Sequence, residues 1–133
     1  MEETWLLLNL ETLDVAKAYL LGNVKFLDLL LVLIIIDILT GIVKAWKLKK
    51  LRSRRAWFGY VRKMLTFLVI IVANIMDQIL GLNGVLTFGT VLFYVSQEVL
   101  SITENLAQVG VKVPKAITDR LQVIEEKSED IDK

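Results

Sequence analysis

The sequence predicts an all-α integral membrane protein, a single domain over residues 1–133 with three transmembrane helices. Apolar stretches at 25–45, 62–82 and 85–105 are each about the length that crosses a bilayer. A short, strongly basic stretch separates the first two. A tight turn, Gly81-Leu82-Asn83-Gly84, separates the last two and is short enough only for an antiparallel hairpin.

The first segment, residues 1–22, is rich in leucine and other good helix formers. Glu11, Asp14 and Lys17 follow one another at one-turn spacing and form a polar wedge. This pattern predicts an amphipathic helix that lies on the membrane surface. A fourth crossing is the alternative, but three charges disfavour insertion.

The first spanning helix, 25–45, carries an acid in its middle. Asp37, Thr40, Gly41 and Lys44 recur at helical spacing and share one face. A charge at mid-membrane is unfavourable by at least a few kcal/mol on insertion scales, so this face should contact protein or water. Its partners must come from later segments or from other copies of the chain.

The connection at 46–61 is basic, with no acid from Lys44 to Lys63. Such a loop marks the cytoplasmic side, which places the tail inside and the 81–84 turn outside. We expect it to face anionic lipid and not nucleic acid. The basic residues that set this topology are Lys47, Lys49, Lys50, Arg52, Arg54, Arg55, Arg62 and Lys63.

The second and third spanning helices also carry polar faces. Hydrogen-bonded helix packing explains such faces, and so does a surface that meets water in one state of an assembly. On the second helix the face consists of Asn74, Asp77, Gln78 and Gly81. On the third it is a heptad-like seam of Thr87, Val91, Tyr94, Glu98, Ser101 and Asn105.

Depths counted from the predicted helix ends suggest partners for the acids, because an unpaired carboxylate in lipid is strongly disfavoured. Asp37 and Asn74 are predicted at similar depths, so we expect a hydrogen bond between them. Glu98 lies nearer the inner face, so we expect it to pair with a base there, Lys44 or Arg62.

The tail, residues 106–133, begins with Gly110 and Pro114, which end the third helix. A short amphipathic helix should follow, with Ile117, Leu121 and Ile124 on one face. We expect the charged end, EEKSEDIDK, to be mobile.

The composition also restricts function. The chain has no Cys and no His, so disulfides and thiol chemistry are excluded and the common metal and nucleophile–base sites have no ligands. We therefore expect no enzyme, no cofactor and no metal. Because Met1-Glu2-Glu3 is acidic where a secretory signal is basic, we also expect no signal peptide.

Several spaced motifs between residues 37 and 114 resemble the toxin-secretion/phage-lysis holin family of Bacillus phages and clostridial toxin loci. The motifs are Asp37-x-x-Thr40-Gly41-x-x-Lys44-Ala45, Ser53, Gly59-x-x-Arg62-Lys63, Asp77, Glu98-x-x-Ser101-Ile102-x-x-Asn105 and Gly110-x-x-x-Pro114. The resemblance implies a homo-oligomer of the bacterial cytoplasmic membrane. It would open timed lesions that release an endolysin or export a toxin, with the polar faces turned toward a lumen.

Two other functions fit the residues. Intramembrane carboxylates also suit a small proton channel or transporter, which would show substrate-specific flux. A non-conducting scaffold would recruit a cytosolic partner through residues 115–133.

Overall fold

The computed structural model describes residues 1–22, 24–49 and 54–132, with side chains except at 55, 56, 131 and 132. In this part of the chain the regular structure is entirely helical, which confirms the predicted fold class. The helices are α1 (Glu2–Leu21), α2 (Leu27–Lys47), α3 (Arg54–Leu80), α4 (Val85–Gln108) and α5 (Lys115–Asp132).

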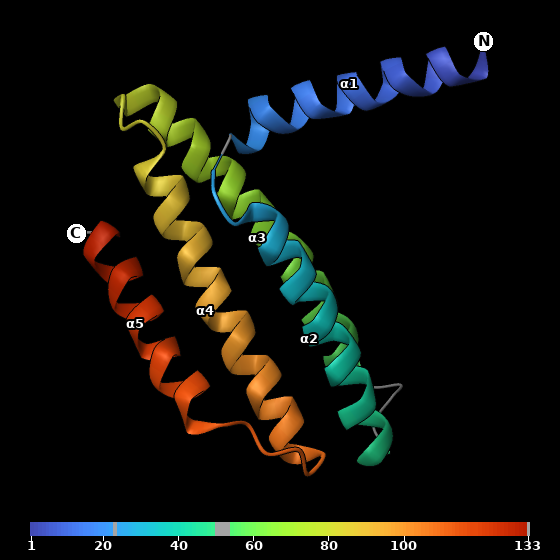
Figure 1. The fold of residues 1–133 in the computed structure, drawn as a ribbon, viewed down its shortest axis with the longest axis vertical. Coiled ribbons are helices and arrows are strands. Elements are labelled where there is room, and N and C mark those ends of the chain that lie inside the picture. Colours follow the sequence, from blue (N-terminus) through green and yellow to red (C-terminus); the bar gives the residue numbers. More distant parts are fainter. Residues whose placement is uncertain (23, 50–53, 133) are drawn as a thin grey trace.

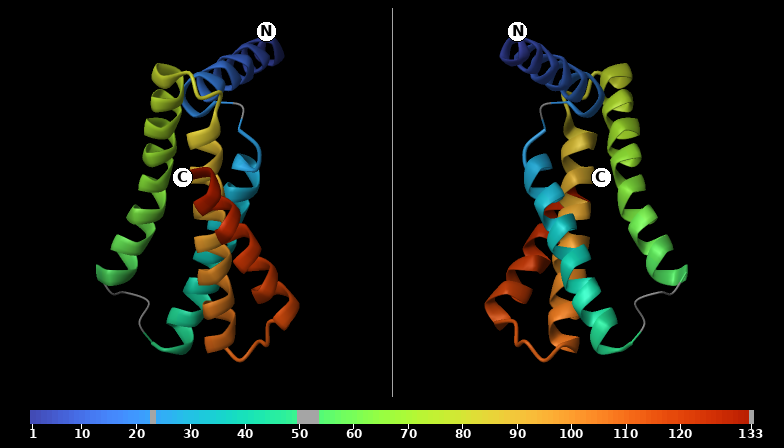
Figure 2. Two further views of the ribbon diagram at one scale, coloured as in Figure 1. Left: turned by 90° about the vertical axis from the view of Figure 1, so that its left-hand side faces the viewer. Right: turned by 90° about the vertical axis from the view of Figure 1, so that its right-hand side faces the viewer.

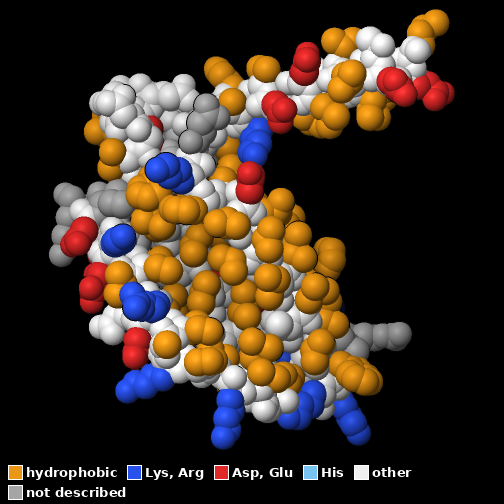
Figure 3. Space-filling view, viewed as in Figure 1, with side chains coloured by type: hydrophobic (Ala, Val, Ile, Leu, Met, Phe, Trp, Pro, Cys, Tyr) orange, Lys and Arg blue, Asp and Glu red, His pale blue; other side chains and the backbone are white. Residues whose placement is uncertain are grey.

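Three of these helices are long and apolar enough to cross a membrane: Leu27–Lys47, Trp57–Leu80 and Val85–Gln108. Many of their large apolar side chains lie on the outside, among them Leu29, Ile35 and Leu68. Figure 3 shows the resulting apolar surface, with Lys and Arg gathered below it at the end that carries the basic loop. Such a surface is stable in lipid, so the chain is a multi-pass membrane protein.

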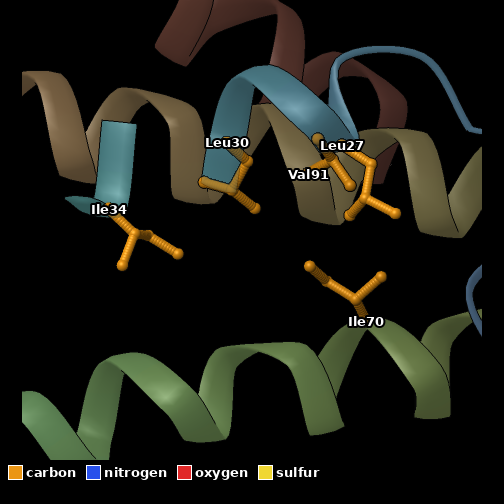
Figure 4. Close-up of a cluster of buried hydrophobic side chains, with 5 residues drawn as sticks. All are labelled: Leu27, Leu30, Ile34, Ile70 and Val91. Carbon is orange, nitrogen blue, oxygen red and sulfur yellow. The ribbon is translucent and has the colours of Figure 1, made fainter. Parts of the chain in front are cut away.

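The three spans run side by side, and α4 contacts both α2 and α3 (Figures 1 and 2). A small apolar core holds them together. Leu27, Leu30 and Ile34 of α2 lie near Val91 of α4, with Ile70 of α3 facing them (Figure 4). This packing leaves one face of α4 free for α5, which lies along it (Figure 1).

The turn between α3 and α4 has the predicted form. Gly81 and Gly84 both have positive φ, 65° and 86°, which glycine adopts without steric strain. The Leu82 N–H donates to the Asp77 carbonyl at 3.0 Å and closes the end of α3. We call the end of the bundle with this turn the hairpin end, and the opposite end the basic-loop end.

Two predicted boundaries are wrong. α3 begins at Arg54 and not at 62, because the basic residues, Ala56 and Trp57 all tolerate a helix and Gly59 does not stop it. The short helix predicted after Pro114 does not end near Glu126 but continues through the charged residues as far as Asp132. Its Glu and Lys residues are good helix formers, and α4 supports the helix along one side.

α1 is confirmed as a helix, but its amphipathic character is weak. By helical spacing, Leu6 and Leu13 lie on one side of its axis, and Leu8 and Val15 lie on the opposite side. The helix projects from the hairpin end of the bundle (Figure 1), and its side chains are exposed up to Leu20.

Candidate functional site

A cluster of charged side chains joins the three spans near the basic-loop end. Asp37 comes from α2, Lys63 from α3 and Glu98 from α4. The Lys63 ammonium donates to Asp37 Oδ2 and to Glu98, with Nζ 3.2 Å from Oε2 and 3.5 Å from Oε1. Asp37 and Glu98 are 2% and 5% exposed. One cation therefore bridges two buried carboxylates, and we call these three residues the charged cluster.

Neutral side chains on α4 donate further hydrogen bonds to Asp37. Ser101 Oγ donates to Asp37 Oδ1 at 2.7 Å, and Asn105 Nδ2 donates to the same oxygen at 2.9 Å. Asn105 also donates to Thr40 Oγ1 at 3.1 Å. Gly41 lies against Asn105, since a Cβ at Gly41 would come 3.7 Å from Nδ2. Among the described side chains, no buried polar atom lacks a hydrogen-bond partner.

A groove between α3 and α4 opens beside the charged cluster. It has a volume of ≈ 540 Å³, and its lining includes Lys63 and Glu98 as well as the apolar side chains of Val69 and Phe93. The cluster is thus closed by α2 on one side and lies next to an open groove on the other.

At the hairpin end, Asp77 caps the start of α4. Its carboxylate accepts from the backbone N–H groups of Leu86 at 3.0 Å and Thr87 at 2.8 Å, and from the Thr87 hydroxyl. The first N–H groups of a helix have no partner within it and carry partial positive charge, so they satisfy a buried carboxylate well. Asp77, at 4% exposed, is therefore stable in a span without a cationic side chain.

Asn74 of α3 binds the last turn of α1, the C-terminal end of that helix. Its Nδ2 donates to the carbonyls of Tyr19 at 3.0 Å and Leu20 at 2.9 Å. The predicted hydrogen bond between Asp37 and Asn74 is therefore wrong. Asn74 lies 11 residues beyond Lys63 on α3, about 16 Å further toward the hairpin end. The predicted depth of Asn74 was counted from a helix start at 62, whereas α3 starts at Arg54.

The prediction that Glu98 pairs with a base is confirmed, but the base is Lys63 and not Lys44 or Arg62. Lys44 is half-buried and Arg62 is exposed. The sequence offered a signal for Lys63, which shares a heptad-spaced line on α3 with Ile70, Asn74 and Asp77. Lys63 was predicted as a basic-loop residue and as part of the Gly59-x-x-Arg62-Lys63 motif, but not as the partner of an acid.

The remaining predicted residues divide into three groups. Thr87 is buried in the α4 seam with Val91, and Tyr94 is half-buried. Gln78 and Gly81 are exposed, so neither joins the buried polar contacts. Lys47, Lys49 and Arg54 are exposed at the basic-loop end, whereas Lys50, Arg52, Ser53 and the Arg55 side chain lie outside the described residues.

The chain is similar in sequence to several known proteins. The chain is 70% identical over 129 residues to the uncharacterized protein YqxH of Bacillus subtilis strain 168, which covers 97% of this chain and 92% of that protein. It is 71% identical over 118 residues to a protein of Bacillus phage phi105 named "Probable holin", covering 89% and 87%. An uncharacterized 14.9 kDa protein of Clostridium perfringens is 38% identical over 100 residues, covering 74% and 75%. No solved structure matches the chain.

The Bacteriophage holin family profile matches residues 15–126, which include α2, α3, α4, the charged cluster and the first two-thirds of α5. The match thus extends past both ends of the region in which the spaced motifs occur. The chain therefore belongs to the bacteriophage holin family, a family of membrane proteins that are not enzymes.

Proposed function

We propose that this holin oligomerises in the bacterial cytoplasmic membrane and opens lesions that let an endolysin reach the cell wall. The observation that carries the proposal is the charged cluster, which places two carboxylates and one ammonium inside helices that span lipid. An endolysin is favoured over a toxin because the phage relative is named a holin.

The closed state follows from the contacts of the cluster. A single chain satisfies Asp37 and Glu98 from its own helices, so the dispersed protein can accumulate without leaking. Taking charges out of water remains unfavourable even when they are paired. Water that enters between associated chains removes that penalty, so the same residues favour a hydrated, open assembly.

The groove beside Lys63 and Glu98 supplies a route for such water. Buried polar groups and close packing of small residues drive helices together in lipid, which supports the homo-oligomer. The exposed bases Lys47, Lys49 and Arg62 support a cytoplasmic basic loop. Collapse of the membrane potential would bias the switch by about 2.3 kcal/mol per charge moved across 100 mV.

Purified protein in liposomes loaded with markers of graded size tests this proposal. We expect release of markers as large as a folded protein, above a threshold density of chains. Liposomes that stay tight at every density would contradict the lesion. A proton channel is the second candidate, favoured by the link from Asp37 through Lys63 to Glu98. It would pass protons and retain every dye.

Asp37→Asn tests the role of the cluster in timing. The variant keeps a side chain that can bond Ser101 and Asn105, and it leaves Lys63 paired with Glu98. We expect normal insertion and a changed time of lesion formation, measured by onset of lysis in cells and by early addition of an energy poison. An Asp37→Asn chain that matches the parent in both measurements would contradict this role.

A further inference from the structure

The helix α5 lies against a membrane span, although the sequence predicted a tail in the cytoplasm. It runs antiparallel to α4 from the basic-loop end back toward the hairpin end (Figures 1 and 2). Ser128 Oγ donates to the Gly89 carbonyl at 3.3 Å, and Ser128 is 2% exposed. The contact is therefore a packed helix interface and not a loose association.

The two helices meet through apolar and small side chains. On α5, Leu121 and Ser128 are buried and share a face with the half-buried Ile124. On α4, Gly89, Leu92 and Ser96 are buried, on the side of the helix away from the charged cluster. Small residues such as Gly89 and Ser96 let two helix backbones approach closely.

The contact extends over almost the full depth of the membrane. Gly89 is only four residues from the start of α4, about 6 Å along its axis. α5 has 18 residues, a length of about 27 Å, close to the hydrocarbon thickness of about 30 Å. The far end of α5 therefore lies near the hairpin end of the spans.

The outer face of α5 cannot meet lipid at that depth. It is highly charged, whereas the insertion of a single charged side chain at the centre of a membrane helix is unfavourable by about 2.5–3.5 kcal/mol. The exposed charged side chains of this face include Asp119, Arg120, Glu126, Lys127, Glu129 and Asp130. Their position beside these spans indicates water on that side of α4 (Figure 3).

We propose that α5 lines the aqueous lumen of the assembled lesion. There it packs on α4 through Leu121, Ile124 and Ser128 and turns its charged face to water. In dispersed chains surrounded by lipid, α5 leaves α4 and lies beyond the basic-loop end, swinging at the non-helical residues 111–114. The inference rests on the proposed lesion-forming function and adds the element that meets the passing solute.

A distance measurement within one chain tests the proposal. The chain has no Cys, so Val85→Cys with Glu129→Cys gives two spin-label sites, both at exposed positions beside the contact. Dilution with unlabelled parent chains removes distances between copies. In leaking liposomes we expect a distance below about 25 Å, since both sites lie within two turns of the Gly89–Ser128 contact. In tight liposomes at low density it should exceed about 35 Å, because α4 alone is about 36 Å long.

Two controls accompany this pair. Val85→Cys with Gln108→Cys reports α4 alone and should stay at about 35 Å in both conditions. Leu121→Lys and Ser128→Lys, added to the first pair, should abolish the short distance. A Val85–Glu129 distance that is equal in tight and in leaking liposomes would overturn the inference and leave the proposed function standing. Liposomes that never leak would overturn the proposed function itself.

Discussion

The two ends of the spanning bundle satisfy a buried aspartate in different ways. At the basic-loop end, Asp37 depends on side chains from two other helices, namely Lys63 of α3 and Ser101 and Asn105 of α4. At the hairpin end, Asp77 binds backbone N–H groups of Leu86 and Thr87. Those groups follow it closely in the chain, across one short turn.

The difference shows which polar contacts can take part in a switch. The Asp77 cap persists whenever the hairpin forms, whatever the neighbours of the hairpin do. The contacts of Asp37 exist only while α2, α3 and α4 stay in register, so separation of the helices breaks all of them together. We infer that the hairpin end is the fixed part of the molecule and the charged cluster is the part that changes.

Lys63→Met should have the largest effect, because it leaves Asp37 and Glu98 buried without a cation. Loss of one partner from a buried ionic group destabilises proteins by about 3–5 kcal/mol. We expect the free energy of unfolding, measured with a chemical denaturant in detergent, to fall by this amount. We also expect less of the variant protein to accumulate in the membrane. The triple variant Lys63→Met, Asp37→Asn, Glu98→Gln removes all three charges and should recover most of the stability. A single Lys63→Met variant as stable as the parent would show that the cluster is not a unit.

Asp77→Ala should have a smaller effect, and one confined to the hairpin. It removes the cap of α4, and loss of a helix N-cap costs about 0.5–2 kcal/mol. Asp77→Asn retains one acceptor oxygen and should cost less. The free energies of unfolding of the two variants in detergent show whether Asp77→Ala is the more destabilising. If Asp77→Ala were as harmful as Lys63→Met, the contrast between the two ends would be wrong.

Local patterns predicted most of the fold. The spans, the basic loop and the hairpin turn can each be recognised from the composition of about 20 consecutive residues. A stretch of that length made of apolar residues spans the bilayer as a helix, so its secondary structure follows from its composition. The ends of α3 and α5 were misplaced because helix-forming charged residues continue a helix that hydropathy alone would stop.

The partners of the site residues were harder to predict. The seam on α4 was predicted because its members share one helix face, and Glu98, Ser101 and Asn105 do bond across to other helices. Which residue of α3 lies at the depth of Asp37 depends on how the two helices are shifted along their axes. A wrong start for α3 moves the predicted partner along the helix by more than two turns. Asn74 was therefore assigned to Asp37, although it binds α1. For α5, the sequence indicated an apolar face with Leu121 and Ile124, but it did not indicate that this face packs on α4.

Asn74→Ala extends the comparison to α1. The variant removes the donor that holds the carbonyls of Tyr19 and Leu20, and a hydrogen bond of this kind contributes about 1 kcal/mol. We expect little change in global unfolding but faster proteolysis near Gly22. Gln78→Ala, one turn further along α3 at an exposed position, is the matched control and should leave proteolysis unchanged. Equal cleavage of the Asn74→Ala variant and the parent would contradict the role of Asn74 as an anchor.

Lys17→Gln should have the smallest effect, because Lys17 and Asp28 pair in the open, with Nζ 2.8 Å from Oδ1 and the two side chains 46% and 84% exposed. The hydrogen bond and charge of Asp28 raise the pKa of Lys17 above its ordinary value of 10.5. A raised pKa means that the pair helps to hold α1 below pH 10.5 and loses this effect as the pH rises through the pKa of the folded state.

Salt should also weaken the Lys17–Asp28 pair, since exposed charges are screened. Proteolysis near Gly22 in the parent should therefore rise with added salt, and in Lys17→Gln it should be insensitive to salt. A parent that shows no dependence on salt would leave Asn74 as the side chain that positions α1 against the bundle.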